Sequence, residues 1–240
     1  MVKLRKLIIS GCVWSFVIIF FWNTLYGKTF HEIKNENDLF DYTSSSVGLQ
    51  TPFLVASSFL LIYLLLLIFH LNGKQLYSLY REGRKGYIKS VQAMNIIFSL
   101  FFVAIFGLTY TICLSSISSI IFLIQNGYFI KLILYIIALA SFYALFGELF
   151  FCINCVIEGR WKAIIVTIII AICVLCLFYY TDCPTPFQSL DVFDMSYYRN
   201  GILVFTYARR VLFNIVLIFL LQVIAEELFL RKDVIMNEVL

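Results

Sequence analysis

The sequence contains one acidic side chain within an otherwise apolar run. Glu148 interrupts the run from residue 132 to 157. A carboxyl group is costly to bury in hydrocarbon, so an acid at such a position is a functional candidate by default. Two interpretations are open. Either Glu148 is a protonated or water-solvated side chain packed between helices, or it lines a substrate path, where it contacts a cationic peptide or orients two helices.

Four of the seven cysteines form two C-x-x-C pairs, Cys152/Cys155 and Cys173/Cys176. In a soluble protein this spacing suggests zinc or redox chemistry. Here the first pair lies near the end of one apolar run, whereas Cys173 lies about 15 Å of helix into the next. One tetrahedral site cannot include both pairs across that distance. We interpret these cysteines as small apolar packing residues and expect no metal.

Near the end of the sequence, Glu226, Glu227 and Arg231 match the E-E-x-x-x-R signature of a family of intramembrane proteases. Those enzymes continue with further spans that supply histidines, whereas the two histidines of this sequence, His31 and His70, both lie upstream. We expect a charged helix end and no catalytic residue here. An intramembrane protease-like protein remains the third alternative.

Composition then indicates which elements must position these side chains. Of the 240 residues, 62% are hydrophobic and 13% are charged, whereas a soluble domain has roughly half apolar residues and about a quarter charged ones. A helix of about 20 apolar residues crosses a bilayer. We expect an all-α, polytopic helical bundle in one transmembrane domain, residues 1–240. The predicted spans are about 7–25, 53–71, 93–124, 132–157, 163–180 and 207–230.

Two spans have distinctive ends. Pro52 suits a helix start, so the second span should begin there. The third run has 32 residues without a charge, or about 48 Å of helix. It must tilt, kink near Gly107 or protrude.

The orientation follows from the distribution of basic residues, because short cytoplasmic loops are enriched in lysine and arginine. With six spans and the N-terminus inside, 12 of the 18 basic residues are cytoplasmic. We expect a multi-pass protein of the cell membrane with both termini in the cytoplasm.

The most basic connection, residues 73–89, follows the second span. Leu76, Leu79 and Tyr80 are spaced as one apolar face of a helix, which predicts a short amphipathic helix at the inner surface. The alternative is an ordinary basic loop that touches anionic lipid headgroups.

Together, these features resemble the six-span membrane subunit of ABC-2 type transporters, especially small Gram-positive permeases for bacteriocin or peptide export and immunity. The resemblance covers nearly the whole chain and rests on lengths, charges and the sequence Phe229-Leu230-Arg231-Lys232-Asp233 rather than on one motif. In that family the segment between spans two and three is a coupling helix that docks into a separate ATPase. The partner-binding residues so implied are Tyr77, Leu79, Tyr80, Arg81, Glu82, Gly83, Arg84 and Lys85.

The resemblance implies a permease subunit that moves a peptide, lipid or other amphipathic substrate. Gly83-Arg84-Lys85-Gly86 lacks the spacing of a phosphate-binding loop, so ATP and Mg would be bound by a partner ABC ATPase and this chain would hold no cofactor. The other expected partners are a second permease, as a homodimer or heterodimer, and membrane lipids, but no nucleic acid. The alternative is a non-transporting membrane scaffold, immunity or assembly subunit.

Overall fold

The computed structural model describes residues 2–26, 39, 51–71, 75–157, 159–181, 183–193 and 204–231, but not the side chains of residues 2–4, 26, 75–82 and 191–193. These residues contain no strand, so the all-α prediction is confirmed for the described part of the chain. The elements, with their bounds, are α1 (Val2–Tyr26), α3 (Pro52–Leu54), η1 (Val55–Phe59), α4 (Leu60–Leu71), α5 (Gln75–Ser115), α6 (Ile120–Gln125), α7 (Tyr128–Val156), α8 (Arg160–Tyr180), η2 (Pro186–Phe193) and α10 (Val204–Arg231).

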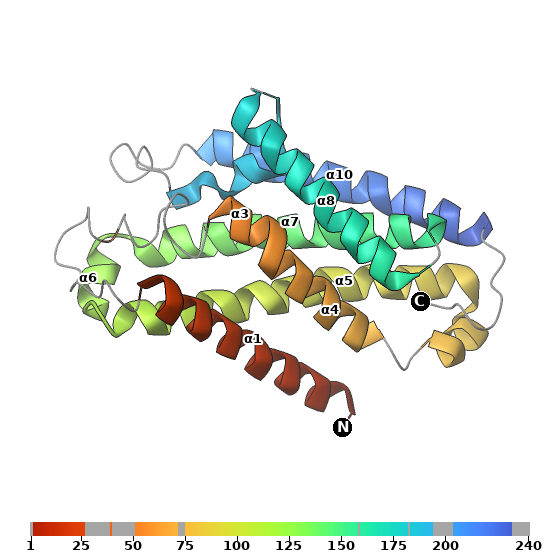
Figure 1. Ribbon diagram of the computed structural model, residues 1–240, viewed down its shortest axis with the longest axis horizontal. Helices are drawn as coiled ribbons and strands as arrows, with labels where there is room; N and C mark the ends of the chain where they lie inside the picture. The colour runs from red at the N-terminus through yellow and green to blue at the C-terminus, as the bar shows by residue number, and fades with distance from the viewer. Residues whose placement is uncertain are drawn as a thin grey trace.

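Six helices in the described residues are long and apolar enough to cross a bilayer, with α3, η1 and α4 forming one continuous span. They make the chain a multi-pass membrane protein. The start of α1 and the end of α10 lie at the same end of the bundle, on the right of Figure 1. This is the arrangement that an even number of crossings produces.

The central helix is α7, which packs against α5, α8, α10 and α4. Of the 18 residues that form its most apolar stretch, 56% are buried, compared with 22% in α10 and 28% in α1. The outer faces of α1, α8 and α10 expose large apolar side chains such as Phe16, Ile165 and Phe219. Lipid tails cover such faces at no cost, so helices of this kind need polar and packing contacts to choose their neighbours.

An aromatic cluster joins α1 to this core. Trp14 is stacked on Phe102 with ring centroids 4.2 Å apart and meets the edge of Phe59 at 5.1 Å. The indole Nε1 also donates a hydrogen bond to the carbonyl of Phe102 at 2.9 Å. The buried indole is thus both packed and satisfied, which fixes the position of α1 against α5 and η1.

The predicted third span, residues 93–124, is wrong at both ends. The described span runs over Gly83–Ser115, and α6 is a separate short helix. Hydroxyl groups end the long helix: Ser115 and Ser116 donate to carbonyls three residues earlier, and Ser119 caps α6 by accepting from the Phe122 amide. Backbone dihedral angles stay helical at Gly107, so the suggested kink there is also wrong.

The break in α5 occurs instead at Gly83, with φ 70° and ψ 173°. A positive φ of this size suits glycine and strains other residues. The amphipathic helix predicted within residues 73–89 is therefore two pieces: residues 75–82 form a short helix, and Arg84, Lys85 and Lys89 belong to the first turns of the span. The second span begins at Pro52 as predicted, while α10 begins at Val204 rather than at residue 207.

Candidate functional site

Glu148 lies on α7 at the contact with α5 and α10 and has no exposed surface. Its Oε1 accepts a hydrogen bond from Asn95 Nδ2 at 2.9 Å and another from Gln222 Nε2 at 3.5 Å. One carboxylate oxygen thus connects three helices that are far apart in the sequence. We call the group of Tyr63, Gln92, Asn95, Glu148 and Gln222 the central polar cluster; Gln222 is half-buried and the other four are buried.

Asn95 is the best-connected member of this cluster. Its Nδ2 also donates to the carbonyl of Ala144 at 2.9 Å, and its Oδ1 accepts from the Tyr63 hydroxyl at 2.5 Å. Both Asn95 and Tyr63 are fully buried. The amide lies so close to α7 that a Cβ placed on Gly147 would come 2.0 Å from Asn95 Oδ1. Glycine at 147 therefore makes the approach of α5 to α7 possible.

Two further hydrogen bonds hold α10 in place. Gln92 Nε2 donates to the carbonyl of Gln222 at 2.9 Å, and the Cys152 thiol donates to the carbonyl of Leu221 at 3.4 Å. The first joins α5 to α10 and the second joins α7 to α10. Side-chain hydrogen bonds to main-chain carbonyls fix the relative position of helices along their axes as well as their separation.

The groups around Glu148 are uncharged. In the described part of the chain, the donors that reach it are two neutral amides, and its Oε2 has no hydrogen-bond partner. In this conformation Glu148 therefore contacts helices rather than an open path. The arrangement can hold α5, α7 and α10 together.

The Gly83 end of α5 is attached to the last turns of α10. Arg84 Nη1 donates to the carbonyl of Leu230 at 3.3 Å, and the buried ring of Tyr87 packs against Phe229 with centroids 5.6 Å apart. Gly83 and Lys85 are exposed. Of the residues implied in partner binding, the side chains of Tyr77, Leu79, Tyr80, Arg81 and Glu82 lie outside the described residues.

These contacts form a continuous line along the α5–α10 interface. Starting from Gly83, the line runs through the pairs Arg84/Leu230, Tyr87/Phe229 and Gln92/Gln222 and ends at Asn95 and Glu148. The segment predicted to bind a partner is thus physically connected to the buried acid. The sequence alone predicted the two ends of this line but not the connection.

The other candidate motifs have ordinary environments. Arg231 forms an exposed salt bridge with Glu227 at 2.7 Å, one helical turn away. His70 lies at the end of α4 and hydrogen-bonds Ser10 at 2.9 Å. Cys173 and Cys176 are exposed on α8, and the described residues contain no group of three or more histidine, cysteine or acidic side chains placed to hold a metal.

No family model matches this chain, and no curated protein or solved structure matches it either.

Proposed function

We propose that this chain is the membrane-spanning permease subunit of an ABC-type transporter, which moves a peptide, lipid or other amphipathic substrate across the cell membrane. The observation that supports this proposal most is the continuous line of contacts along the α5–α10 interface. It connects a short segment outside the span with a buried polar cluster where four helices meet. A subunit driven by a separate ATPase needs such a connection.

The mechanism follows from the stiffness of α5. Beyond Gly83 the helix continues without a break to Ser115, so a push on residues 75–82 is transmitted along it as a rigid-body movement. Gly83 provides the joint at which the short segment changes direction. Movement of α5 acts on the pair Gln92/Gln222, which joins it to α10, and on the pair Asn95/Glu148, which joins it to α7.

The opposite end of the bundle also supports the proposal. Between α8 and α10 the chain forms η2, which packs against α7, α8 and α10. Phe187 of η2 is fully buried and contacts Phe142 and Phe178, at centroid distances of 4.8 and 6.1 Å. The ABC-2 type permeases that the sequence resembles have short re-entrant helices before their last span, and by this resemblance the segment 183–207, which contains η2, would correspond to them.

The proposed orientation places the Gly83 end of the bundle in the cytoplasm, together with both termini. Most basic residues then lie on the cytoplasmic side, as the positive-inside rule requires. A single cysteine at position 85 in a cysteine-free background should be shielded from an impermeant reagent in intact cells, whereas one at position 34 should react. Labelling at position 85 from outside would contradict this orientation.

The decisive experiment is purification of the tagged chain from its own membrane. We expect a soluble ATPase to be recovered in a fixed ratio with it, and a second permease copy or a related chain beside it. Tyr80→Ala combined with Glu82→Ala should release the ATPase or uncouple ATP hydrolysis from transport, since truncating an interface anchor costs about 2 kcal/mol or more.

The matched control neutralises four basic residues of the same segment. If the segment only contacts lipid, neutralising Arg81, Arg84, Lys85 and Lys89 should weaken the binding of this segment to the anionic lipid surface by about 1 kcal/mol per charge. The Tyr80/Glu82 change should then have little effect. Recovery of the chain in a complex without any ATPase would contradict the proposal and favour a scaffold, immunity or assembly subunit.

A further inference from the structure

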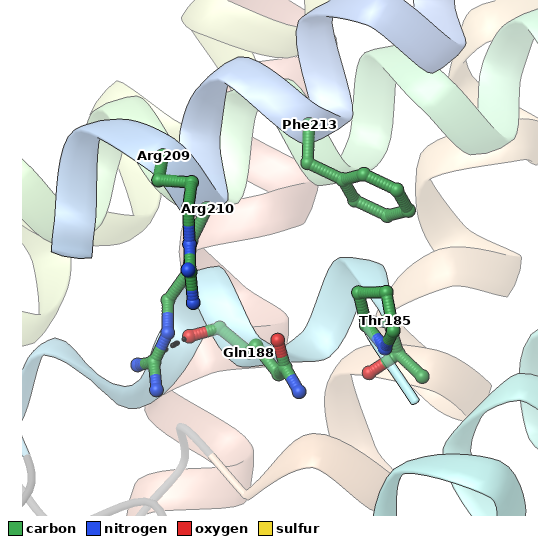
Figure 2. Close-up of a pocket in the computed structure, with 6 residues that line it drawn as sticks. Thr185, Gln188, Arg209, Arg210 and Phe213 are labelled. Carbon is green, nitrogen blue, oxygen red and sulfur yellow. Dashed lines mark hydrogen bonds between the residues drawn. The ribbon is translucent and has the colours of Figure 1, made fainter. Parts of the chain in front are cut away.

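A pocket of about 380 Å³ opens between η2 and the first turns of α10, at the end of the bundle opposite Gly83 (Figure 2). Its volume falls within the range of small-molecule sites. The pocket is lined by Pro184, Thr185, Gln188, Arg209, Arg210 and Phe213.

Two arginines provide its positive charge. Figure 2 shows the side chains of Arg209 and Arg210 extending from α10 towards η2. Arg210 Nη1 donates to the carbonyl of Gln188 at 3.0 Å, so η2 holds this guanidinium at the edge of the pocket. Arg209 is exposed. Guanidinium groups bind phosphate oxygens through pairs of parallel hydrogen bonds, and two adjacent arginines suit one phosphate group.

A buried hydroxyl provides a second, independent indication of a ligand. Thr185 is 5% exposed and lines the pocket, yet its Oγ1 has no hydrogen-bond partner among the described residues. A buried polar atom without a partner is costly, and such atoms are rare in folded proteins. The Oγ1 atom is covered in this conformation, so the Thr185 side chain has to rotate before an oxygen atom of a ligand in the pocket can accept its proton.

The remaining walls are apolar. Phe213, one helical turn along α10 from Arg209 and Arg210, faces the pocket together with Pro184. A free phosphate ion would leave these walls without a contact. A phosphate attached to glycerol and acyl chains would use both the charged and the apolar parts.

From these features we propose that the pocket binds the phosphate of an anionic phospholipid such as phosphatidylglycerol. The arginines and Thr185 bind the phosphate oxygens, and Phe213 and Pro184 contact the glycerol and the first acyl carbons. The pocket lies where a membrane-crossing helix begins, at the depth of lipid headgroups. A lipid bound there contacts η2 and α10 at once and stabilises η2 in its place. This inference is independent of the proposed transport function.

The test is native mass spectrometry of the delipidated full-length protein in detergent, titrated separately with phosphatidylglycerol, phosphatidylcholine and inorganic phosphate. We expect one phosphatidylglycerol per chain, bound at least about tenfold more tightly than phosphatidylcholine because the choline cation opposes two arginines. Losing a charge-assisted hydrogen bond corresponds to roughly a tenfold change, so Arg209→Gln should weaken binding by about that factor. Thr185→Val, which keeps the shape of the side chain, should weaken it about three- to tenfold.

The matched control is Arg231→Gln, which removes an exposed arginine from the other end of the same helix. It should leave phosphatidylglycerol binding unchanged. Arg210 is left intact because it also holds η2. Equal binding of the two lipids, or equal weakening by Arg231→Gln and Arg209→Gln, would overturn the proposal. So would tight binding of inorganic phosphate that displaces the lipid, since the site would then serve the free ion.

Discussion

Two polar groups connect α7 with α10, and they consist of different kinds of side chain. The central polar cluster uses a carboxyl group and long amides from three spans. Nearer the opposite end, Asn214 of α10 donates to the hydroxyls of Ser189 and Ser141 at 3.0 and 3.2 Å and approaches the carbonyl of Pro186 at 3.5 Å. We call this second group, which ties η2 to α7 and α10, the outer polar junction.

The two groups differ in the hydrogen bonds that the other side chains keep when one member is replaced. In the outer polar junction, Ser141 and Ser189 also donate to carbonyls three residues earlier in their own segments, at 2.7 and 2.8 Å. In the central cluster, loss of the Asn95 side chain leaves Tyr63 only the longer bond to the Asn95 main-chain carbonyl, at 3.3 Å, and Glu148 only the bond from Gln222, at 3.5 Å. Burial is similar in both groups, so the number of alternative partners should decide how much each substitution costs.

The largest effect is expected from Gly147→Ala. The new Cβ would meet Asn95 Oδ1 at 2.0 Å and Cγ at 2.7 Å, and Asn95 cannot withdraw without losing Tyr63, Ala144 and Glu148. Overpacking of a rigid site costs about 3 kcal/mol or more. Thermal and denaturant unfolding of the purified protein in detergent would measure the loss.

Gly11→Ala is the matched control. Its Cβ would come 2.8 Å from Cδ1 of Ile105, the far end of a flexible side chain that can rotate away. We expect a cost below about 1 kcal/mol, which is the usual range for a tolerated packing change. Equal losses at Gly147 and Gly11 would show that the central cluster is not held rigidly.

The next largest difference should separate the two asparagines. Asn95→Leu leaves the Tyr63 hydroxyl and the Glu148 carboxyl without their main partner, at a cost of about 2–3 kcal/mol. Asn214→Leu should cost about 1 kcal/mol or less, because both serine hydroxyls keep their carbonyl acceptors. The free energy of unfolding of the two variants tests this difference. A larger loss for Asn214→Leu than for Asn95→Leu would contradict the role of alternative hydrogen-bond partners.

Much of the fold was predictable because each span is a long apolar run. Charged residues and Pro52 marked most ends correctly. The prediction of the third span failed because residues 93–124 contain no charge, while the Ser115 and Ser116 hydroxyls bond to the backbone where α5 ends and the Ser119 hydroxyl caps the start of α6. A prediction based on charged residues alone does not detect a helix end of this kind.

The candidate site was predictable only in part. Glu148 stood out as the one acid in a span, but its partners Asn95 and Gln222 are 53 and 74 residues away in the sequence. The available signal was the presence of uncharged amides within apolar runs, where each needs a partner. Which amides meet depends on how the helices pack, and the periodicity of one segment does not specify that.

A smaller effect is expected from the two neighbouring tyrosines of the core. Tyr63 and Tyr143 are both buried, with ring centroids 5.1 Å apart. Tyr63→Phe removes the hydrogen bond to Asn95 and should cost about 0.6–1.7 kcal/mol, the range for hydrogen bonds between membrane helices.

Tyr143→Phe serves as its control, because the Tyr143 hydroxyl is buried without a hydrogen-bond partner in the described part of the chain. Removing a group of this kind is nearly neutral or slightly stabilising. The difference between the two unfolding free energies therefore measures the hydrogen bond rather than the ring. A cost for Tyr143→Phe as large as that for Tyr63→Phe would mean that ring packing alone determines both.

The smallest change in stability is expected from Glu148→Gln. The amide oxygen of glutamine can accept from Asn95 and Gln222 as Oε1 does, and its Nε2 takes the place of Oε2, which has no described partner. We expect the unfolding free energy to fall by less than about 1 kcal/mol, because the hydrogen bonds that Oε1 accepts are kept and one unpaired buried polar atom replaces another. Glu148→Leu, in contrast, leaves Gln222 Nε2 without this acceptor and should lower stability by about 1–2 kcal/mol.

Activity of the same two variants then separates a linking role from a chemical one. If Glu148 acts by connecting α5, α7 and α10, Glu148→Gln should keep both assembly and transport, whereas Glu148→Leu should reduce both together. A stable, fully assembled Glu148→Gln protein that no longer transports would contradict the linking role, because only the charge or the proton of the carboxyl group differs. The acid itself would then be required, as it would be if helix movement exposes Glu148 to a cationic substrate.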